Sequence, residues 1–457
     1  MTTASMRNRL GTFRLYLLGG GLGPFLIRSL AGSGAVQIAG MAVTFLVGVQ
    51  LARGLGLEGY GYYGIAMAAV SLASVPGEYG IPRLVVREVA AASASDDRPR
   101  LFGVLRWADR AGLLIGLGLA VAVALVAFAV AGPDDTAVIA IFWGAPIIPL
   151  VALARNRGAA LQGLQHVVGG QVPFMLVRPL AFALLLFAMF LAWPGAGARH
   201  AMALNGLTAA GALLVGHLWL SRRLPARPAT AMAAGGNWLK SALSMALADG
   251  MRVTQLQLVV LLLGLLASVS ATGLFRVAVS ILVAIALPIT VMNSIVAPVM
   301  ARLYAEGDHR RLQQMCTHSA RWMTAGVFTL SLPFVFWGAP LIGFVFGAEY
   351  APAAIPLLIL AGGQIVTACF GVNIGLLMMT GHEQRVTRAM FWGLLASLVL
   401  TLALVPAWSE IGGAIATVGA LLVWNLLTWI DAHKFLGIET SAFATRARLA
   451  RFGPGPR

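Results

Sequence analysis

The chain has 457 residues, of which 59% are hydrophobic and 11% are charged, and its mean hydropathy is +0.86. A globular domain is typically about 45–50% apolar and about 25% charged. The composition therefore excludes a soluble globular protein and indicates a membrane protein. The net charge of +16 must then be explained by where the basic residues lie.

Residues 1–34 precede the first predicted span. Their apolar part, 15–27, is interrupted by glycines and a proline, and no small-residue cleavage site follows, so we expect no cleavable signal peptide. Four arginines in this segment suit contact with anionic headgroups: Arg7, Arg9, Arg14 and Arg28. We predict an N-terminal interfacial segment that lies on the membrane surface.

A helix that crosses a bilayer needs roughly 20 apolar residues. Twelve such stretches follow one another, separated by short polar or glycine- and proline-marked breaks: 35–53, 61–82, 111–131, 136–154, 172–193, 201–220, 241–266, 273–299, 322–345, 352–379, 389–406 and 411–433. We therefore predict an all-α, polytopic membrane protein with twelve transmembrane helices.

The lysines and arginines sort to one side of the membrane when these spans are assumed. With the N-terminus inside, 27 of the 32 lie in cytoplasmic segments, and two, Arg53 and Arg199, lie in external ones. Three remain within spans: Arg178, Arg252 and Arg276. Because cytoplasmic loops are enriched in these residues, both termini are predicted to be cytoplasmic. The positive charge reflects topology rather than a nucleic-acid-binding face, and no nucleic-acid partner is expected.

The stretch GLEGYGYYGIA at 56–66 contains a G-x-G-x-x-G pattern at Gly59, Gly61 and Gly64. That fingerprint binds a dinucleotide only between a strand and a helix of a βαβ unit. Here the glycines fall at the predicted external turn between the first two spans, so we expect no nucleotide site. Small residues let membrane helices approach closely, which is the role we predict for them.

The two halves of the chain resemble each other in sequence. The ordered matches are Gly61 on Gly273 and Pro76 on Pro288 at a shift of 212, 106–107 on 321–322 at 215, and Gly163 on Gly381 at 218. Small insertions explain a shift that grows steadily along the chain. The series predicts two pseudo-symmetric six-helix lobes around a central cavity, in which transporters of this build bind substrate.

The predicted organisation has five parts. They are the interfacial segment 1–34, the N-lobe 35–220 with helices 1–6, a polar cytoplasmic linker 221–240, the C-lobe 241–434 with helices 7–12, and a basic cytoplasmic tail 435–457. Pro76 and Pro288 lie deep within the second and eighth spans. Since proline removes a backbone hydrogen bond, we predict that both helices are kinked and line the cavity; the alternative is that membrane helices simply tolerate proline.

Ionisable groups within spans cost on the order of 2.5–3.5 kcal/mol at a helix centre, so those that persist need a reason. The seventh span places Arg252 near its midpoint and Asp249 one turn earlier, with Gln255 on the face of Arg252. One alternative is an ion pair that fixes this helix. The other is an anion-binding arginine, with Asp249 orienting it or carrying a coupling ion.

Two further spans carry polar stripes: Arg276, Ser280, Thr290 and Ser294 in the eighth, and Tyr60, Ser71, Ser74 and Glu78 in the second. Guanidinium groups suit phosphates because they bind bidentately and stay charged. The predicted substrate-binding residues are Arg252, Arg276, Gln255, Ser280, Ser294, Tyr60, Ser71 and Ser74. Asp249 and Glu78 are the candidates for ion coupling, although Glu78 could instead pair with Arg83. Arg178 is expected to snorkel to the inner interface.

Catalytic motifs are missing from the sequence. It contains no H-E-x-x-H, C-x-x-C, P-loop lysine or G-x-S-x-G pattern. The two cysteines, Cys316 and Cys369, predict no disulfide framework. We expect no enzyme activity, no metal site and no cofactor.

Several stretches carry a family likeness. LARGLGLEGYGYYGIAMAAVS with GIPRLVVREVA resembles bacterial polysaccharide-repeat-unit flippases of the multidrug/oligosaccharidyl-lipid/polysaccharide exporter superfamily. TQLQLVVLLLG, ATGLFRVAVSILVAIALPI with APVMARLYAEGD, and LLMMTGHEQ resemble the same family in the same order, so the likeness covers about 35–434. It implies transfer of undecaprenyl-diphosphate-linked oligosaccharides to the outer leaflet by alternating access, for O-antigen or exopolysaccharide synthesis. The cationic cavity would be lined by helices one, two, seven and eight.

One departure concerns coupling. Family members often carry an acidic residue shortly before LLLG in the seventh span, where this chain has Gln257, Leu258 and Val259. The hypothesis of H⁺ or Na⁺ counter-transport therefore shifts to Asp249. The rivals are a cation-coupled multidrug exporter of the same fold, a peptidoglycan-precursor flippase and, more remotely, a membrane glycosyltransferase or polymerase. The resemblance implies a bacterial inner-membrane location, with a polysaccharide polymerase and glycosyltransferases as partners.

Overall fold

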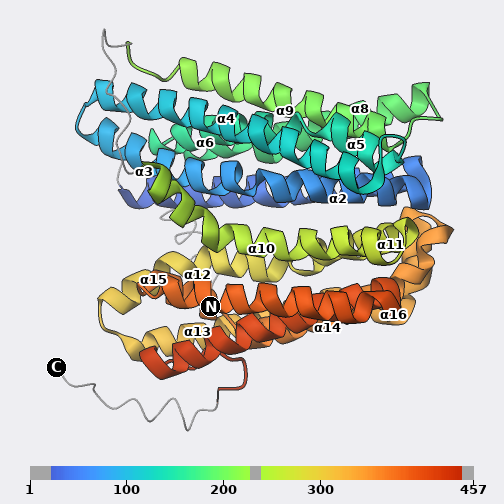
Figure 1. Cartoon of the computed structure of the whole chain (residues 1–457). Coiled ribbons are helices and arrows are strands. Elements are labelled where there is room, and N and C mark those ends of the chain that lie inside the picture. The colour runs from blue at the N-terminus through green and yellow to red at the C-terminus, as the bar shows by residue number, and fades with distance from the viewer. Residues whose placement is uncertain (1–21, 227–237, 445–457) are drawn as a thin grey trace, which may run out of the picture.

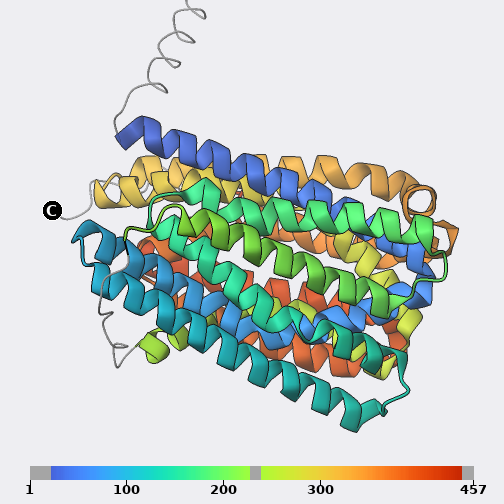
Figure 2. The same ribbon diagram turned by 90° about the horizontal axis from the view of Figure 1, so that it is seen from above.

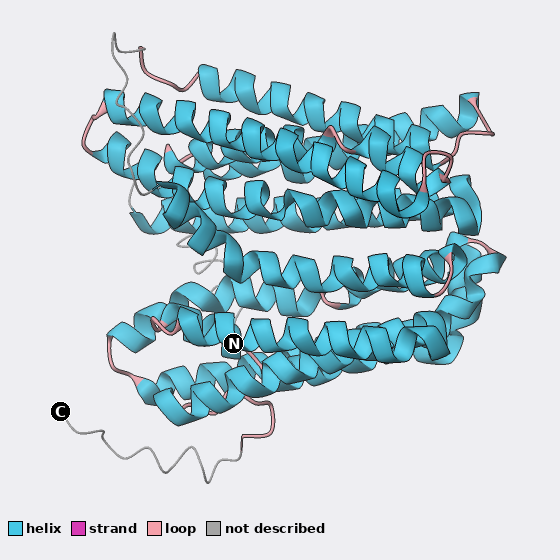
Figure 3. Cartoon of the chain, viewed as in Figure 1, coloured by secondary structure: helices cyan, strands magenta, loops and turns pink. Residues whose placement is uncertain are grey.

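The computed structural model describes residues 22–226 and 238–444, and all regular secondary structure within these ranges is helical (Figure 3). The predicted all-α fold class is confirmed. Most of the predicted interfacial segment, residues 227–237 of the predicted linker, and residues 445–457 of the tail lie outside the described residues. The helices of both halves run alongside one another (Figure 2), as expected for a bundle that crosses one membrane.

Two groups of helices form the upper and lower halves of the molecule in Figure 1. The first group consists of α2 (Leu22–Val75), η1 (Pro76–Gly80), α3 (Ile81–Ala94), α4 (Arg98–Ala131), α5 (Thr136–Gly144), α6 (Ile147–Gly163), α7 (Val167–Val172), η2 (Pro173–Val177), α8 (Arg178–Ala192) and α9 (Ala198–Ser221). The second consists of α10 (Trp238–Leu266), α11 (Val269–Ile285), α12 (Leu287–Ala305), α13 (His309–Phe346), η3 (Ala348–Ala353), α14 (Ala354–Phe370), α15 (Asn373–Met379), α16 (Glu383–Asp431) and η4 (Ala432–Leu436). We call them the N-lobe and the C-lobe.

Nine helical segments of the described chain are long and apolar enough to cross a membrane, and two shorter apolar helices, Gly250–Leu266 and Val269–Ile285, accompany them. Three of the nine contain a break, at Gly56 (φ 68°) in α2, at Trp337 (φ −130°) in α13 and at Ser409 (φ 45°) in α16. Gly48 and Tyr60 lie close together, since a Cβ on Gly48 would be only 3.8 Å from Tyr60 Oη. In a straight helix the two residues would be about 18 Å apart along the axis, too far for this contact. The chain therefore turns back at Gly56. The count of twelve spans stays a prediction.

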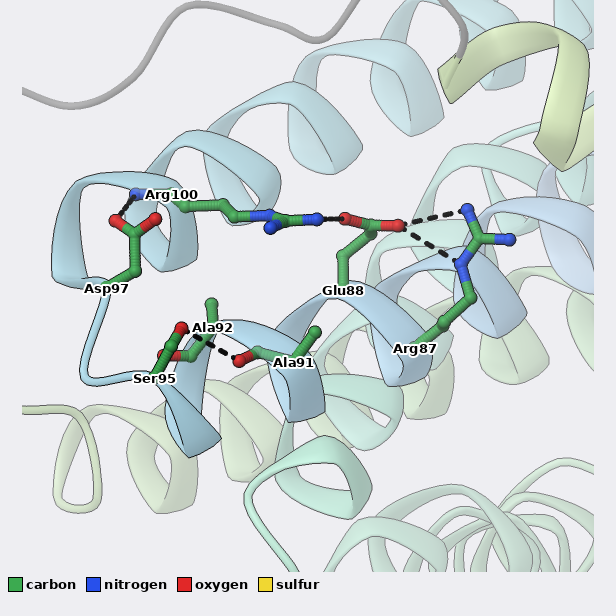
Figure 4. A network of polar contacts seen from close by, with 7 residues as sticks. All are labelled: Arg87, Glu88, Ala91, Ala92, Ser95, Asp97 and Arg100. Carbon is green, nitrogen blue, oxygen red and sulfur yellow. Dashed lines mark hydrogen bonds and ion pairs between the residues drawn. The ribbon is translucent and has the colours of Figure 1, made fainter.

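The turns at Gly56, Ser268, Gly347 and Ser409 lie at one end of the bundle, since Gly56 lies beside Glu349, Gly61 beside Val269 and Gly413 beside Leu263. We call it the Gly56 end. The opposite end, the Asp97 end, carries the α3–α4 turn. Figure 4 shows how this turn is held: Glu88 on α3 accepts a hydrogen bond from Arg100 Nη2 on α4 at 2.7 Å and pairs with Arg87 Nη2 at 2.9 Å. The buried Glu88 carboxylate thus ties α3 to α4.

Helices α4 and α13 begin at matching places in the two lobes and are capped in the same way. Asp97 Oδ1 accepts a hydrogen bond from Arg100 N at 3.0 Å, and Asp308 Oδ1 accepts one from Arg311 N at 2.9 Å. We expect Asp97→Ala or Asp308→Ala to lower the free energy of unfolding by about 1 kcal/mol, because each leaves a first-turn N–H without its acceptor. Thermal unfolding in detergent measures the loss. The exposed Asp134 provides the control, and a loss as large in Asp134→Ala would contradict the capping role.

The lobes meet where α2 packs against α10 and α11. A Cβ on Gly61 would lie 2.1 Å from Val269 O, and a Cβ on Gly273 would lie 2.6 Å from Leu57 O. The two contacts are related by the same shift of 212 that aligns the halves of the sequence. The crossing is therefore pseudo-symmetric, and the predicted role of Gly61 in close helix approach is confirmed.

Both prolines mark irregular helix. Pro76 begins the π-helical η1, and the break between α11 and α12 falls at Ala286, two residues before Pro288. The predicted distortions are thus present in both lobes.

Two expected boundaries differ from the structure. The first is the start of α2, which already begins at Leu22, within the predicted interfacial segment, since Pro24 is tolerated in a first helical turn. The predicted basic tail, from 435 on, begins within η4 (Ala432–Leu436) and continues along the C-lobe, where Ala442 N donates to Cys369 O at 2.9 Å.

Candidate functional site

Arg276 reaches from α11 of the C-lobe across to α2 of the N-lobe. Its guanidinium carbon stands 5.7 Å from the centre of the Tyr60 ring and 5.9 Å from that of Tyr63, within the range of cation–π attraction. Its stem lies on Gly64, where a Cβ would come within 2.3 Å of Arg276 Cδ. Gly64 in the N-lobe and Arg276 in the C-lobe are equivalent by the shift of 212. Because Gly64 has no side chain, the stem of Arg276 fits against it.

One nitrogen of this guanidinium is left without a partner. Arg276 Nε is shielded from solvent and makes no hydrogen bond to any described residue. Nearby, Ser280 Oγ donates to Arg276 O at 2.9 Å and lies 3.4 Å from Tyr60 Oη. A buried donor without a partner is rare. The Nε atoms of Arg155 and Arg157 are unpaired as well, but the Nη2 atoms of these residues pair with Glu78 and Asp109, whereas Arg276 pairs with no carboxylate of the described residues.

Arg178 does not snorkel to the interface. Its Nη2 donates to Asn205 Oδ1 of α9 at 3.0 Å, and Asn205 Nδ2 donates to Tyr63 Oη at 3.0 Å. A buried amide offers the guanidinium the acceptor that hydrocarbon lacks, which explains why the side chain stays within the N-lobe. Tyr63 therefore lies between the guanidinium groups of Arg178 and Arg276.

A third arginine joins the cluster through an aromatic ring. Arg155 on α6 donates from Nη2 to Glu78 Oε1 at 2.7 Å, and its guanidinium carbon lies 4.1 Å from the centre of the Phe174 ring. Arg178 lies 5.0 Å from the centre of the same ring. The sequence placed Arg155 in a cytoplasmic segment, whereas α6 extends to Gly163 and carries it inside the bundle.

We call Glu78, Arg155, Arg178 and Arg276, with the groups that link them, the arginine cluster. Three guanidinium groups and one carboxylate give it a net charge of +2. Charge of one sign inside a membrane bundle is costly unless something neutralises it. The cluster is therefore suited to an anion.

The other predicted site residues lie on α2, α10 and α12. Arg252 is exposed on α10, Gln255 is buried, and Ser71 is half-buried. Ser74 Oγ donates to Val70 O at 2.8 Å and Ser294 Oγ donates to Val291 O at 2.7 Å, so both hydroxyls are satisfied within their own helices.

The structure joins three predicted site residues, Arg276, Tyr60 and Ser280, in one contact group. Arg252 lies about 10 Å closer to the Asp97 end along the helix axis than Arg276, counted from the α10–α11 turn at 1.5 Å per residue. The side chain of Asp249, and with it the proposed Asp249–Arg252 pair, lies outside the described residues. Within the described part of the chain, no group of three or more His, Cys, Asp or Glu could hold a metal ion.

The apolar helices of the described chain and their arrangement in two lobes define a multi-pass membrane protein with a transporter fold. The chain is similar to an inward-facing multidrug-resistance MATE transporter of the MOP superfamily. The superposition covers 88% of this chain and 98% of that transporter, with 13% sequence identity and a TM-score of 0.71. The lipid II flippase MurJ in an inward closed conformation matches with 12% identity, 89% of this chain, 88% of its own length and a TM-score of 0.67. A MOP-superfamily transporter from Pyrococcus furiosus matches with 14% identity, 90% of this chain, 96% of its own length and a TM-score of 0.61.

The chain belongs to the polysaccharide biosynthesis protein family, whose sequence profile matches residues 26–304, more than half of its length. The resemblance seen in the sequence is confirmed at this level. No curated protein matches the sequence significantly. The low identities to the solved transporters establish a shared fold, and the family adds the connection to polysaccharide synthesis.

Proposed function

We propose that this protein is a flippase that moves undecaprenyl-diphosphate-linked oligosaccharides from the cytoplasmic to the outer leaflet by alternating access. Membership of a polysaccharide biosynthesis family and the fold shared with a lipid II flippase support this. The observation that carries the proposal is the arginine cluster, with its net charge of +2 and the unpartnered Nε of Arg276. A diphosphate linkage supplies negative charge and the acceptor oxygens that guanidinium groups bind bidentately.

In this proposal the Asp97 end faces the cytoplasm of a bacterial inner membrane, with both termini on that side. The lobes 35–220 and 241–434, joined by the linker 221–240, rock about the Gly61–Gly273 crossing. The diphosphate enters a central cavity between them. Arg252, which lies nearer the Asp97 end, contacts the diphosphate first, and Arg276 holds it near mid-membrane. The glycan occupies the cavity, and the lipid tail stays in the bilayer.

The test is reconstitution into vesicles with a labelled lipid-linked oligosaccharide, whose appearance in the outer leaflet is measured. We expect Arg276→Ala to lower transport about 10- to 100-fold, because a charge-assisted hydrogen bond contributes about 1.5–3 kcal/mol. Arg276→Lys should recover little, since it keeps the charge but loses the planar fork. The exposed Arg199 serves as the control. Wild-type rates in a folded Arg276→Ala protein would refute the proposed site.

Two questions remain for the same assay. A peptidoglycan-precursor flippase would also bind a diphosphate-linked sugar, so lipid II and a polysaccharide repeat unit are offered in competition. Coupling to H⁺ or Na⁺ is proposed through Asp249 or Glu78 and is measured as the response of transport to an imposed gradient. A multidrug exporter would instead transport organic cations, which the positive charge of the arginine cluster disfavours.

A further inference from the structure

Hydrogen bonds cross between the lobes at the Gly56 end. Arg53, just before the turn of α2, donates from Nε to Val345 O of α13 at 2.8 Å and from Nη2 to Phe344 O. In the other direction, Tyr350 of η3 donates from Oη to Ala52 O at 2.9 Å. Each lobe thus binds backbone carbonyl groups of the other.

We call these three hydrogen bonds the latch. Their acceptors are backbone carbonyl groups near helix ends. Val345 and Phe344 belong to the last turn of α13, where carbonyl groups have no intrahelical partner. A cation is favourable there, because the helix dipole is negative at its C-terminus. Tyr350 is fully buried, so its hydroxyl needs the partner that Ala52 O provides. The sequence assigned Arg53 to an external segment and named no partner for it.

The latch is connected to the arginine cluster through one side chain. The Tyr350 ring meets the Tyr60 ring edge-on, with 6.4 Å between their centres. Tyr60 also contacts the guanidinium of Arg276, 5.7 Å from its ring centre, and the ring of Tyr63 stacks on it with 6.4 Å between the two centres. Tyr60 is 1% exposed, so a shift of Arg276 or Tyr350 must be accommodated by repacking. A change at Arg276 therefore reaches Tyr350 through direct contacts.

We propose that the latch is the gate of the Gly56 end, and that an anion bound by Arg276 releases it through Tyr60. The gate follows from the contacts between the lobes alone, while its release by an anion rests on the proposed function. Phosphate oxygens compete for the guanidinium and bind it more strongly than an aromatic face does. Tyr60 then repacks, Tyr350 loses its edge contact, and the hydrogen bond to Ala52 O is weakened.

The gate is tested by a distance measurement between spin labels on the full chain in nanodiscs. Cysteines replace Glu58 and Glu349, which are exposed at this end, and Cys316 and Cys369 are replaced by alanine. We expect Arg53→Ala and Tyr350→Phe each to add a longer-distance population, with the open-to-closed ratio rising about tenfold for the charged donor. Arg199→Ala is the control. Unchanged distances in both latch variants, with unchanged thermal unfolding, would overturn the gate.

The link is tested by adding a short-chain polyprenyl diphosphate, with the corresponding alcohol as control and binding measured separately by calorimetry. The diphosphate should open the gate in the wild type and in Tyr60→Phe, which keeps the ring. Tyr60→Leu lacks the ring that Tyr350 contacts, so it should be partly open without the diphosphate. At a diphosphate concentration that saturates it in calorimetry, it should not open further. A diphosphate-dependent increase in opening as large as that of the wild type would refute the link. Absence of diphosphate binding to the wild type would refute the proposed function and the link together, while the latch variants still decide the gate.

Discussion

Replacing Gly61 or Gly273 by alanine is expected to force α2 and α11 apart and to lower the free energy of unfolding by on the order of 1–3 kcal/mol, as overpacking of a tight contact does. The new Cβ would lie 2.1 Å from Val269 O in the first case and 2.6 Å from Leu57 O in the second. Both obstacles are backbone carbonyl groups, so no side-chain rotation relieves the overlap. Only movement of one lobe relative to the other can do so.

Thermal unfolding of purified protein measures this loss, and transport is expected to fall with it, because the crossing is where the lobes pivot in the proposed mechanism. Gly118→Ala and Gly211→Ala are matched controls: both glycines lie in helices, and a Cβ at either meets nothing within 4 Å. These controls should be neutral or slightly stabilising, since alanine favours helix over glycine. A Gly61→Ala protein as stable as Gly118→Ala would show that the crossing is loosely packed.

Much of the fold could be predicted because a bilayer restricts the choices of the chain. Long apolar stretches must become helices that satisfy their own backbone groups, and glycine and proline positions then indicate crossings and kinks. The internal repeat at a shift of 212 also predicted which residues are equivalent in the two lobes. It paired Gly61 with Gly273, and the structure places these two residues at one pseudo-symmetric contact.

Only part of the arginine cluster could be predicted from the sequence. A span predicted from hydropathy ends where a charged residue interrupts the apolar stretch. The predicted span therefore ended just before Arg155, although α6 continues to Gly163. Arg178 was recognised as charged within a span, but its partner Asn205 lies on another helix. Arg53 contacts carbonyl groups nearly 300 residues away in the chain. No local pattern reveals such partners, because they depend on how the helices pack.

Removing the carboxylate of Glu78 is expected to destabilise the protein strongly, because it leaves the guanidinium of Arg155 without its partner inside the bundle. The side chains of Glu78 and Arg155 are 14% and 29% exposed, and their closest atoms are 2.7 Å apart. Breaking a buried pair costs about 3–5 kcal/mol, and partial exposure places Glu78→Leu near the lower limit. Unfolding of Glu78→Leu in detergent measures this value. Glu306→Ala breaks the exposed Arg302–Glu306 pair and should cost at most about 1 kcal/mol.

The double variant Glu78→Leu/Arg155→Met separates a structural role from ion coupling. It removes both charges and replaces them with apolar side chains, so we expect it to recover most of the stability that Glu78→Leu loses. A double variant as unstable as the single one would show that the pair is not the source of the loss. If Glu78 carries the coupling ion, the stable double variant should no longer respond to a pH or Na⁺ gradient. A retained response would assign coupling to another group, with Asp249 as the remaining candidate, and leave Glu78 as the structural partner of Arg155.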